Sequence, residues 1–126
     1  MKIILYIAAG GALGSVARYA VILLSHQSFG VFFPFGTLIA NSLGSFILGL
    51  LLSIYNVFSL STHEIEAFWI IGVLGAFTTF SAVSSDTMDL LDQKETLLVI
   101  LYVCGPVLTS IFGFILGWEI VRIVCQ

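Results

Sequence analysis

The sequence contains very little charge. Of its 126 residues, only 9% are Asp, Glu, Lys or Arg, whereas 60% are hydrophobic, and the mean hydropathy is +1.17. This composition excludes an ordinary water-soluble domain. The 4 Lys and Arg residues form no basic run, so nothing in the chain is suited to a nucleic-acid phosphate backbone. We therefore expect a protein whose solvent is lipid.

Residues that carry enzyme chemistry are also scarce. The two cysteines, Cys104 in an apolar run and Cys125, have neither metal-ligand spacing nor the density of a disulfide scaffold. The sequence shows no nucleophile–base pair, metal-ligand cluster or phosphate-binding glycine loop. It therefore predicts no enzymatic activity.

Asp, Glu, Lys and Arg are absent from four long stretches of the sequence. These stretches are residues 3–17, 19–63, 67–85 and 96–118. A helix needs about 20 apolar residues to cross a hydrocarbon core of about 30 Å, so the second stretch must turn back near Pro34 and Gly36. We predict an all-α integral membrane protein with one transmembrane domain, residues 1–126. Its four transmembrane helices are expected at residues 3–25, 36–58, 65–91 and 96–124.

A cleaved signal peptide is the alternative interpretation of the first span. Lys2, a short apolar stretch and the small residues 8–12 are typical of one. The apolar register continues to Leu24, beyond the cleavage site that such a peptide would have, and three further spans follow. This pattern favours a membrane helix.

The Lys and Arg residues are divided evenly between the two sides of the predicted bundle. Lys2 and Arg122 fall on one side, whereas Arg18 and Lys94 fall on the other. Orientation follows the Lys/Arg asymmetry of short loops, so we expect the chain to insert in both directions. Copies of opposite orientation could then pair.

Small residues recur every four positions on three of the predicted helices. They are Gly10 and Gly14, then Ser45 and Gly49, and finally Gly105, Thr109, Gly113 and Gly117. In lipid, such stripes carry helix association through close packing. They could pack the four helices of one chain or two chains against each other. Because four slender helices pack solidly, we expect any pathway to lie between two chains.

Two polar residues lie within the first two spans, and each has two interpretations. Arg18 is about 9 Å deep at about 1.5 Å per residue, which suits either snorkelling to the interface or a positive vestibule for anions. Asn41 lies with Thr37 and Ser45 on one face of the second helix. Its amide could join helices or donate hydrogen bonds to an anion.

The third span contains many glycine and hydroxyl residues where it should cross mid-membrane. They occur at Gly72, in Gly75-Ala76-Phe77-Thr78-Thr79-Phe80-Ser81, and in Ser84-Ser85-Asp86. Their low helix propensity predicts a broken helix whose backbone lines a cavity. The alternative is a continuous helix with hydroxyls bonded to the preceding turn. Phe77 and Phe80 are ordinarily packing residues, but the positive edge of a Phe ring can also face an anion.

The fourth span contains two hydroxyl residues and a proline. Tyr102 and Ser110 add hydroxyls on nearby faces, and Pro106 between them removes a backbone donor and predicts a kink.

No acidic residue is expected in the core of a span, because Asp86 and the other acidic residues fall at the ends of spans or in loops. His26 and His63 are also expected in loops. This favours passive conduction over proton-coupled transport.

Several motifs together resemble one known family. They are Gly10-Gly11 with Gly14 and Arg18-Tyr19, Phe35-Gly36-Thr37-Leu38 with Asn41 and Gly44, and Gly75 to Ser81. Over nearly its whole length the chain resembles the CrcB/Fluc fluoride channels. The resemblance implies a fluoride-selective channel of the cell inner (plasma) membrane, which exports fluoride passively from the cytoplasm and gives fluoride resistance. It also implies an antiparallel, dual-topology homodimer.

The resemblance further implies roles for individual residues. A structural sodium ion at the dimer centre would be held by the backbone carbonyls of Gly75 and Thr78 from both chains. Asn41 would donate hydrogen bonds to fluoride, and Phe80 would present its ring edge to it. Polar groups along the pathway and its vestibule would be Thr37, Thr79, Ser81, Tyr102, Ser110 and Arg18.

Two positions depart from the family pattern. Val83 replaces the second aromatic residue of a pair, and Pro106 replaces a frequent serine. A heterodimer whose partner supplies the missing ring is therefore an alternative, as is a non-conducting regulatory subunit. A small dual-topology multidrug exporter is the remaining alternative, but it would need an acidic residue in the first helix, which this chain lacks.

Overall fold

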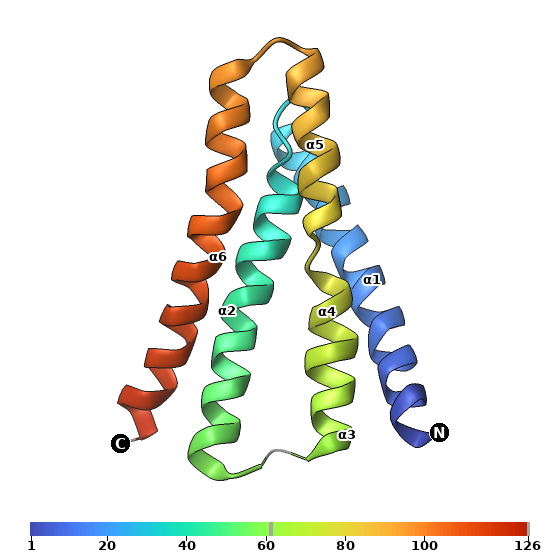
Figure 1. Ribbon diagram of the computed structural model, residues 1–126, viewed down its shortest axis with the longest axis vertical. Coiled ribbons are helices and arrows are strands. Elements are labelled where there is room, and N and C mark those ends of the chain that lie inside the picture. The colour runs from blue at the N-terminus through green and yellow to red at the C-terminus, as the bar shows by residue number, and fades with distance from the viewer. Residues whose placement is uncertain (61, 126) are drawn as a thin grey trace.

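The computed structural model describes residues 1–60 and 62–125 (Figure 1). Four long apolar segments run between the two ends of the molecule. They are α1 (Lys2–Phe29), α2 (Phe35–Phe58), a third segment over His63–Asp92, and α6 (Thr96–Cys125). Each is long and apolar enough to cross a membrane. Within the described ranges every regular element is helical, which confirms the predicted all-α class with four spans.

The turn between α1 and α2 lies where the sequence predicted it. Gly30 ends α1 with a positive φ of 78°, a conformation that glycine adopts without steric cost, and its N–H donates to the His26 carbonyl at 3.0 Å. Pro34 immediately precedes α2. Because α1 continues to Phe29, His26 lies in the last helical turn, and its expected placement in a loop was wrong. His63 opens the third segment rather than lying in a loop.

The third segment is interrupted, as predicted. Its first part comprises α3 (His63–Ile65), η1 (Glu66–Leu74), a stretch of wide π-helix, and α4 (Gly75–Phe77). Thr78 and Thr79 then adopt extended backbone conformations, and α5 (Phe80–Asp92) begins after them. The alternative of a continuous helix is therefore wrong. The π-helical turn was not predicted, because a wider helical turn leaves no distinct pattern in the order of residues.

Small residues bring the helices of this one chain into close contact. A Cβ atom at Gly49 would meet the Phe114 carbonyl oxygen, and one at Gly117 would meet the Phe46 carbonyl oxygen. A Cβ at Gly113 would lie 3.0 Å from the Ser42 carbonyl oxygen. These contacts join α2 to α6, which lie side by side and run in the same direction (Figure 1). For these residues, packing within the chain is confirmed.

Gly10 and Gly14 likewise bring α1 into close contact with the first half of the third segment. We predict that Gly14→Ala lowers the free energy of unfolding by about 2 kcal/mol, because the added methyl would overlap the Val73 carbonyl oxygen. Gly11→Ala is the matched control, since nothing lies within 4 Å of its Cβ position. Denaturant titration of the purified protein in detergent would measure both. Equal midpoints for the two variants would show that this contact is not tight.

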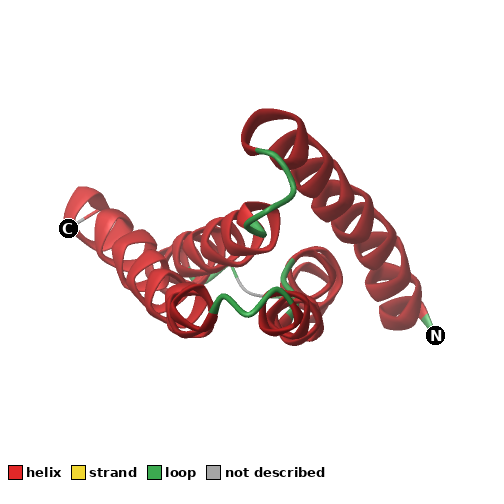
Figure 2. Ribbon diagram, turned by 90° about the horizontal axis from the view of Figure 1, so that it is seen from above, coloured by secondary structure: helices red, strands yellow, loops and turns green. Residues whose placement is uncertain are grey.

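Much of the apolar surface of the four segments faces outward. Seen from above, α2 and α6 lie on one side and α1 on the other, and the first half of the third segment packs mainly against α1 (Figure 2). Many large apolar side chains remain exposed along the helices, among them Leu108, Phe112 and Ile115 on α6. Such a surface is typical of segments that face lipid or another membrane protein.

Candidate functional site

A groove with a volume of about 610 Å³ opens at the helix break. It is bounded by α2, by the chain on both sides of Thr78 and Thr79, and by α6. Its lining includes Asn41, Ser45, Gly75, Thr78, Thr79, Phe80, Val83, Pro106 and Ser110. The structure thus brings together six of the predicted site residues, from three separate segments: Asn41, Gly75, Thr78, Thr79, Phe80 and Ser110.

Asn41 on α2 forms hydrogen bonds with the backbone at the break. Its Oδ1 accepts a hydrogen bond from the Thr79 N–H at 2.7 Å, and its Nδ2 donates to the Thr79 carbonyl at 2.9 Å. The amide therefore replaces main-chain hydrogen bonds that the interrupted helix has lost. Asn41 thus joins α2 to the break, as one of the two interpretations of this residue predicted. Its Nδ2 carries a second N–H, so Asn41 could also donate a hydrogen bond to an anion, which was the other interpretation.

The same hydrogen bonds release backbone carbonyls at the break. In a continuous helix the Thr79 N–H would bond to the Gly75 carbonyl, but here it donates to Asn41. The Ala82 N–H would bond to the Thr78 carbonyl, but here it donates to Thr79 Oγ1 at 3.2 Å. The Gly75 and Thr78 carbonyl oxygens are thus left without their helical donors, and both residues line the groove. Neutral carbonyl oxygens suit a hard cation such as sodium.

Phe80 begins α5 directly after the break and lines the groove with 75% of its surface exposed. Phe77, three residues earlier, is buried, and its ring carbon Cδ1 lies 3.0 Å from a Cβ position at Gly44. Of the two rings considered, Phe77 is therefore the packing residue and Phe80 is available to a ligand. Ser81 lies outside the groove, and its hydroxyl is 3.0 Å from that of Thr79.

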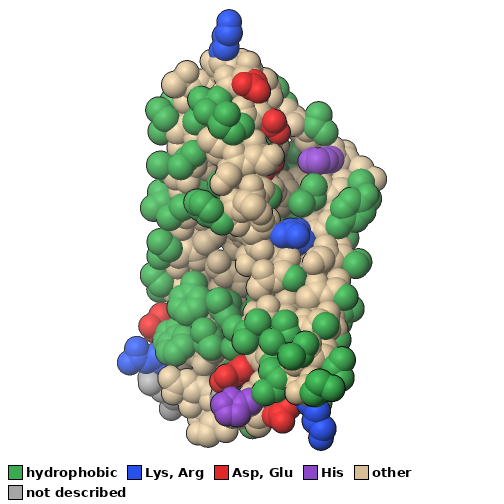
Figure 3. Space-filling view, turned by 45° about the vertical axis from the view of Figure 1, so that its right-hand side comes forward, with side chains coloured by type: hydrophobic (Ala, Val, Ile, Leu, Met, Phe, Trp, Pro, Cys, Tyr) green, Lys and Arg blue, Asp and Glu red, His purple; other side chains and the backbone are tan. Residues whose placement is uncertain are grey.

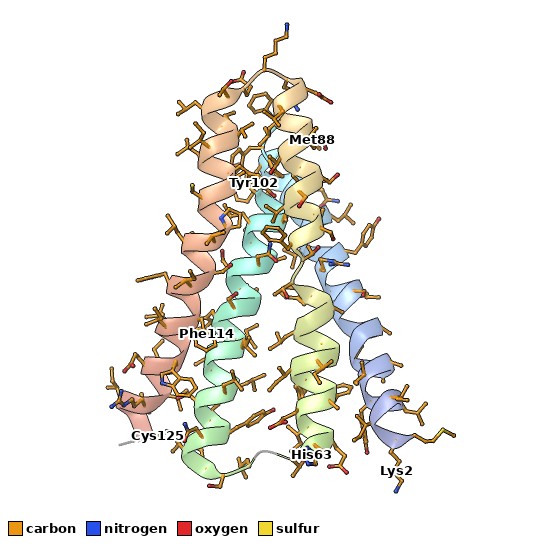
Figure 4. All side chains as sticks on the ribbon, viewed as in Figure 1. Lys2, His63, Met88, Tyr102, Phe114 and Cys125 are labelled. Atoms are coloured by element: carbon orange, nitrogen blue, oxygen red, sulfur yellow. The ribbon has the colours of Figure 1, made fainter. Side chains whose placement is uncertain are left out.

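Tyr102 and Thr37 form a separate polar group beyond the end of the groove. Tyr102 is fully buried and points from α6 into the space beside α5 and α2 (Figure 4). Its hydroxyl donates to Asp86 Oδ2 at 2.6 Å, and Thr37 lies beside it. The Phe33 ring packs edge-on against the Tyr102 ring, with 5.5 Å between the ring centroids. The structure therefore does not place Tyr102 and Thr37 in the groove itself.

Asp86 is the functional candidate that the sequence did not reveal. It lies on α5 near the end of the third segment, as expected, and it also accepts a hydrogen bond from the buried Tyr102. A buried tyrosine hydroxyl requires a hydrogen-bond partner, so Tyr102 was the residue in the sequence that could have indicated a polar group nearby. Nothing in the sequence indicated which residue provides it.

Asp86 also lines a second hollow, which has a volume of about 460 Å³. Its polar lining consists of His26, Asp86, Asp89, Asp92 and Gln93. Charged side chains are mostly gathered toward the two ends of the molecule (Figure 3). Arg18 is half-buried on α1 and lines neither the groove nor the hollow.

The fold and the groove define a small multi-pass membrane protein with polar groups at an interrupted helix. The chain belongs to the CrcB family, because the family model described as CrcB-like protein, Camphor Resistance (CrcB), matches residues 5–118.

Similar proteins are named as fluoride-specific ion channels FluC. The protein from Shewanella halifaxensis is 43% identical over 121 residues, which are 96% of this chain and 97% of the relative. The protein from Thermus thermophilus is 42% identical over 120 residues, or 95% of each chain. The protein from Rhizobium meliloti is 41% identical over 122 residues, or 97% of this chain and 98% of the relative.

Proposed function

We propose that this protein is a fluoride-selective channel that exports fluoride passively from the cytoplasm and so gives fluoride resistance. Membership of the CrcB family and the names of the similar proteins support this function. The observation that carries it is the groove at the break, where amide, hydroxyl and aromatic groups meet. Among the described residues, no charged side chain lines this groove. An anion would meet donors there without meeting a carboxylate.

The groups in the groove can replace part of the hydration of a small anion. Asn41 would donate through its second amide N–H, while its other bonds to Thr79 fix the direction of that N–H. The Thr79 and Ser110 hydroxyls add donors along the groove. Phe80 would present the positive edge of its ring without a competing charge. No bond is made or broken in this passage, which is conduction and not an enzymatic reaction.

The working assembly in this proposal is a homodimer of oppositely inserted copies in the cell inner (plasma) membrane. The sequence assigns as many Lys and Arg residues to one side of the bundle as to the other, which supports insertion in both directions. The exposure of Phe80 supports a second chain over the groove, since a residue that binds a dehydrated ion should be shielded from lipid. Arg18 would then supply positive potential near the mouth of the pathway.

Sodium would sit between the two copies in this assembly, held by the Gly75 and Thr78 carbonyl oxygens of each. Two neutral oxygens per chain would give four ligands in the dimer, and their missing helical donors make them available. When bound, the ion would join the two breaks and offset the repulsion between facing carbonyl dipoles.

Fluoride release from liposomes that contain only this polypeptide tests the proposed function. We expect rapid fluoride efflux, recorded with a fluoride-selective electrode, from vesicles held at equal internal and external pH. Chloride efflux from matched vesicles should remain at the level of protein-free vesicles. Absence of fluoride efflux from correctly folded protein would favour the non-conducting regulatory subunit. Efflux that requires a pH gradient would favour coupled transport.

A further inference from the structure

Gly44 on α2 leaves room for the residues at the helix break. It is buried and lines the groove three residues after Asn41, so the two residues lie on the same face of α2. A Cβ atom at Gly44 would meet the Thr78 methyl carbon Cγ2 and would lie 3.0 Å from Phe77 Cδ1. Thr78 and Phe77 therefore occupy space that any side chain at position 44 would fill.

The side chain of Thr78 is held in place by the helical turn that precedes the break. The Thr78 N–H and its Oγ1 hydroxyl both donate to the Leu74 carbonyl, at 3.0 and 2.9 Å. A β-branched side chain has few favourable rotamers, and a rotation that moved the methyl group away would also break the hydroxyl bond. A side chain at position 44 would thus displace the Thr78 backbone and not only its methyl group.

The peptide group between Thr78 and Thr79 links this contact to Asn41. Its N–H donates to Asn41 Oδ1 at 2.7 Å, and the carbonyl of Thr79 accepts from Asn41 Nδ2 at 2.9 Å. In a trans peptide the C=O and the N–H point in opposite directions, so the bond to Asn41 also sets the direction of the Thr78 carbonyl. The break is therefore held on α2 at two points, by hydrogen bonds at Asn41 and by a close fit at Gly44.

We infer that Gly44 is a positioning residue for fluoride passage, which seats Thr78 so that Asn41 can hold the adjoining peptide in the groove. The inference rests on the proposed function. Gly44 offers no donor to an ion, and it acts by keeping Thr79 within hydrogen-bond distance of Asn41. These contacts fix the second Asn41 N–H and the Thr79 hydroxyl, which would face fluoride. Groups that bind a ligand must be held within about 0.5 Å of their working geometry.

Gly44→Ala should therefore slow fluoride passage. The added methyl group would push Thr78 away from α2 and lengthen the bonds between Thr79 and Asn41. We expect the rate of efflux from liposomes to fall about tenfold, the factor for losing one hydrogen bond to a charged group. At low protein content, the fraction of vesicles that release fluoride counts the folded channels, whereas the rate of release from those vesicles measures passage. We expect the rate to fall and the fraction to stay constant.

A Thr78→Ser background tests the contact directly, because this change removes the Cγ2 methyl and keeps the hydroxyl that bonds Leu74. The factor by which Gly44→Ala lowers the rate should shrink from about tenfold in the wild-type background to about twofold in the Thr78→Ser background. The remaining factor reflects the nearby Phe77 ring. A role of Gly44 in helix packing alone would give the same factor in both backgrounds.

Gly113→Ala is the matched control for the added methyl group. Its Cβ would lie 3.0 Å from the Ser42 carbonyl oxygen, between α6 and α2 but outside the groove. The rate of efflux from this variant should stay within a factor of about two of the wild-type rate. Size-exclusion chromatography of all variants would show whether the assembly is intact.

The outcomes separate the role of Gly44 from the proposed function. A conducting wild type with an unchanged rate in Gly44→Ala, or with the same loss in both backgrounds, would overturn the inference and leave the channel function intact. An equal loss in Gly113→Ala would also overturn it. If Gly44→Ala alone does not fold, the double variant with Thr78→Ser decides the question. Efflux at about half the Thr78→Ser rate or faster supports the inference, whereas slower efflux or an unfolded double variant overturns it. A wild type that releases no fluoride would reject the proposed function and the inference together.

Discussion

Replacing Asn41 by Asp is expected to lower fluoride efflux about a thousandfold. The substitution is nearly isosteric and keeps the oxygen that accepts from the Thr79 N–H, but it removes the amide donor and adds a negative charge to the groove. Two like unit charges 4 Å apart repel by about 4 kcal/mol at an effective dielectric constant of 20, which corresponds to that factor. Electrode recordings from liposomes would measure the rate.

Asn56→Asp is the matched control for this prediction. Asn56 lies on the same helix, near its end, and is exposed outside the groove, so the same chemical change should leave the efflux near the wild-type rate. Efflux from Asn41→Asp at the wild-type rate would remove Asn41 from the pathway. Its contact with the Thr79 backbone would then be its only role.

Replacing Phe80 by Ile is expected to reduce fluoride efflux at least about tenfold. Ile keeps an apolar side chain at the groove but has no ring edge, and a tenfold reduction corresponds to about 1.4 kcal/mol of lost anion stabilisation. Phe80 is 75% exposed within its own chain, so the change should cost little in the folding of that chain. Efflux rates and thermal unfolding of the same samples would separate the two effects.

Phe112→Ile provides the comparison for Phe80. Phe112 is similarly exposed, at 68%, but it lies on α6 outside the groove. Its substitution should leave both the efflux and the unfolding temperature unchanged. Normal efflux from Phe80→Ile would show that Phe80 only packs, either on lipid or on a partner chain.

The break in the third segment could be predicted from the sequence because its cause is local. Glycine and hydroxyl residues around Thr78 lower helix propensity, and Thr79 can cap a new helix through its own side chain. The four spans were predictable for a similar reason, since charge is absent over lengths that suit a membrane. These features depend on neighbouring residues in the chain.

The contacts between distant residues could not be predicted in the same way. That Tyr102 bonds Asp86 depends on how α5 and α6 come together after the break. The glycine stripes left two kinds of packing open, and only the positions of facing carbonyls, such as that of Phe46 at Gly117, show that they join helices of one chain. Arg18 carried a strong chemical signal, but it lies on α1 and does not line the groove.

The most direct test of this account is the orientation of the chain in the membrane, because the proposed pathway requires two oppositely inserted copies. Cys125 is an exposed residue at the end of α6, and in a Cys104→Ser background it becomes the only thiol. We predict that a membrane-impermeant maleimide labels about half of the chains in sealed vesicles, and the remainder only after permeabilisation. Labelling of all chains, or of none, before permeabilisation would contradict the account.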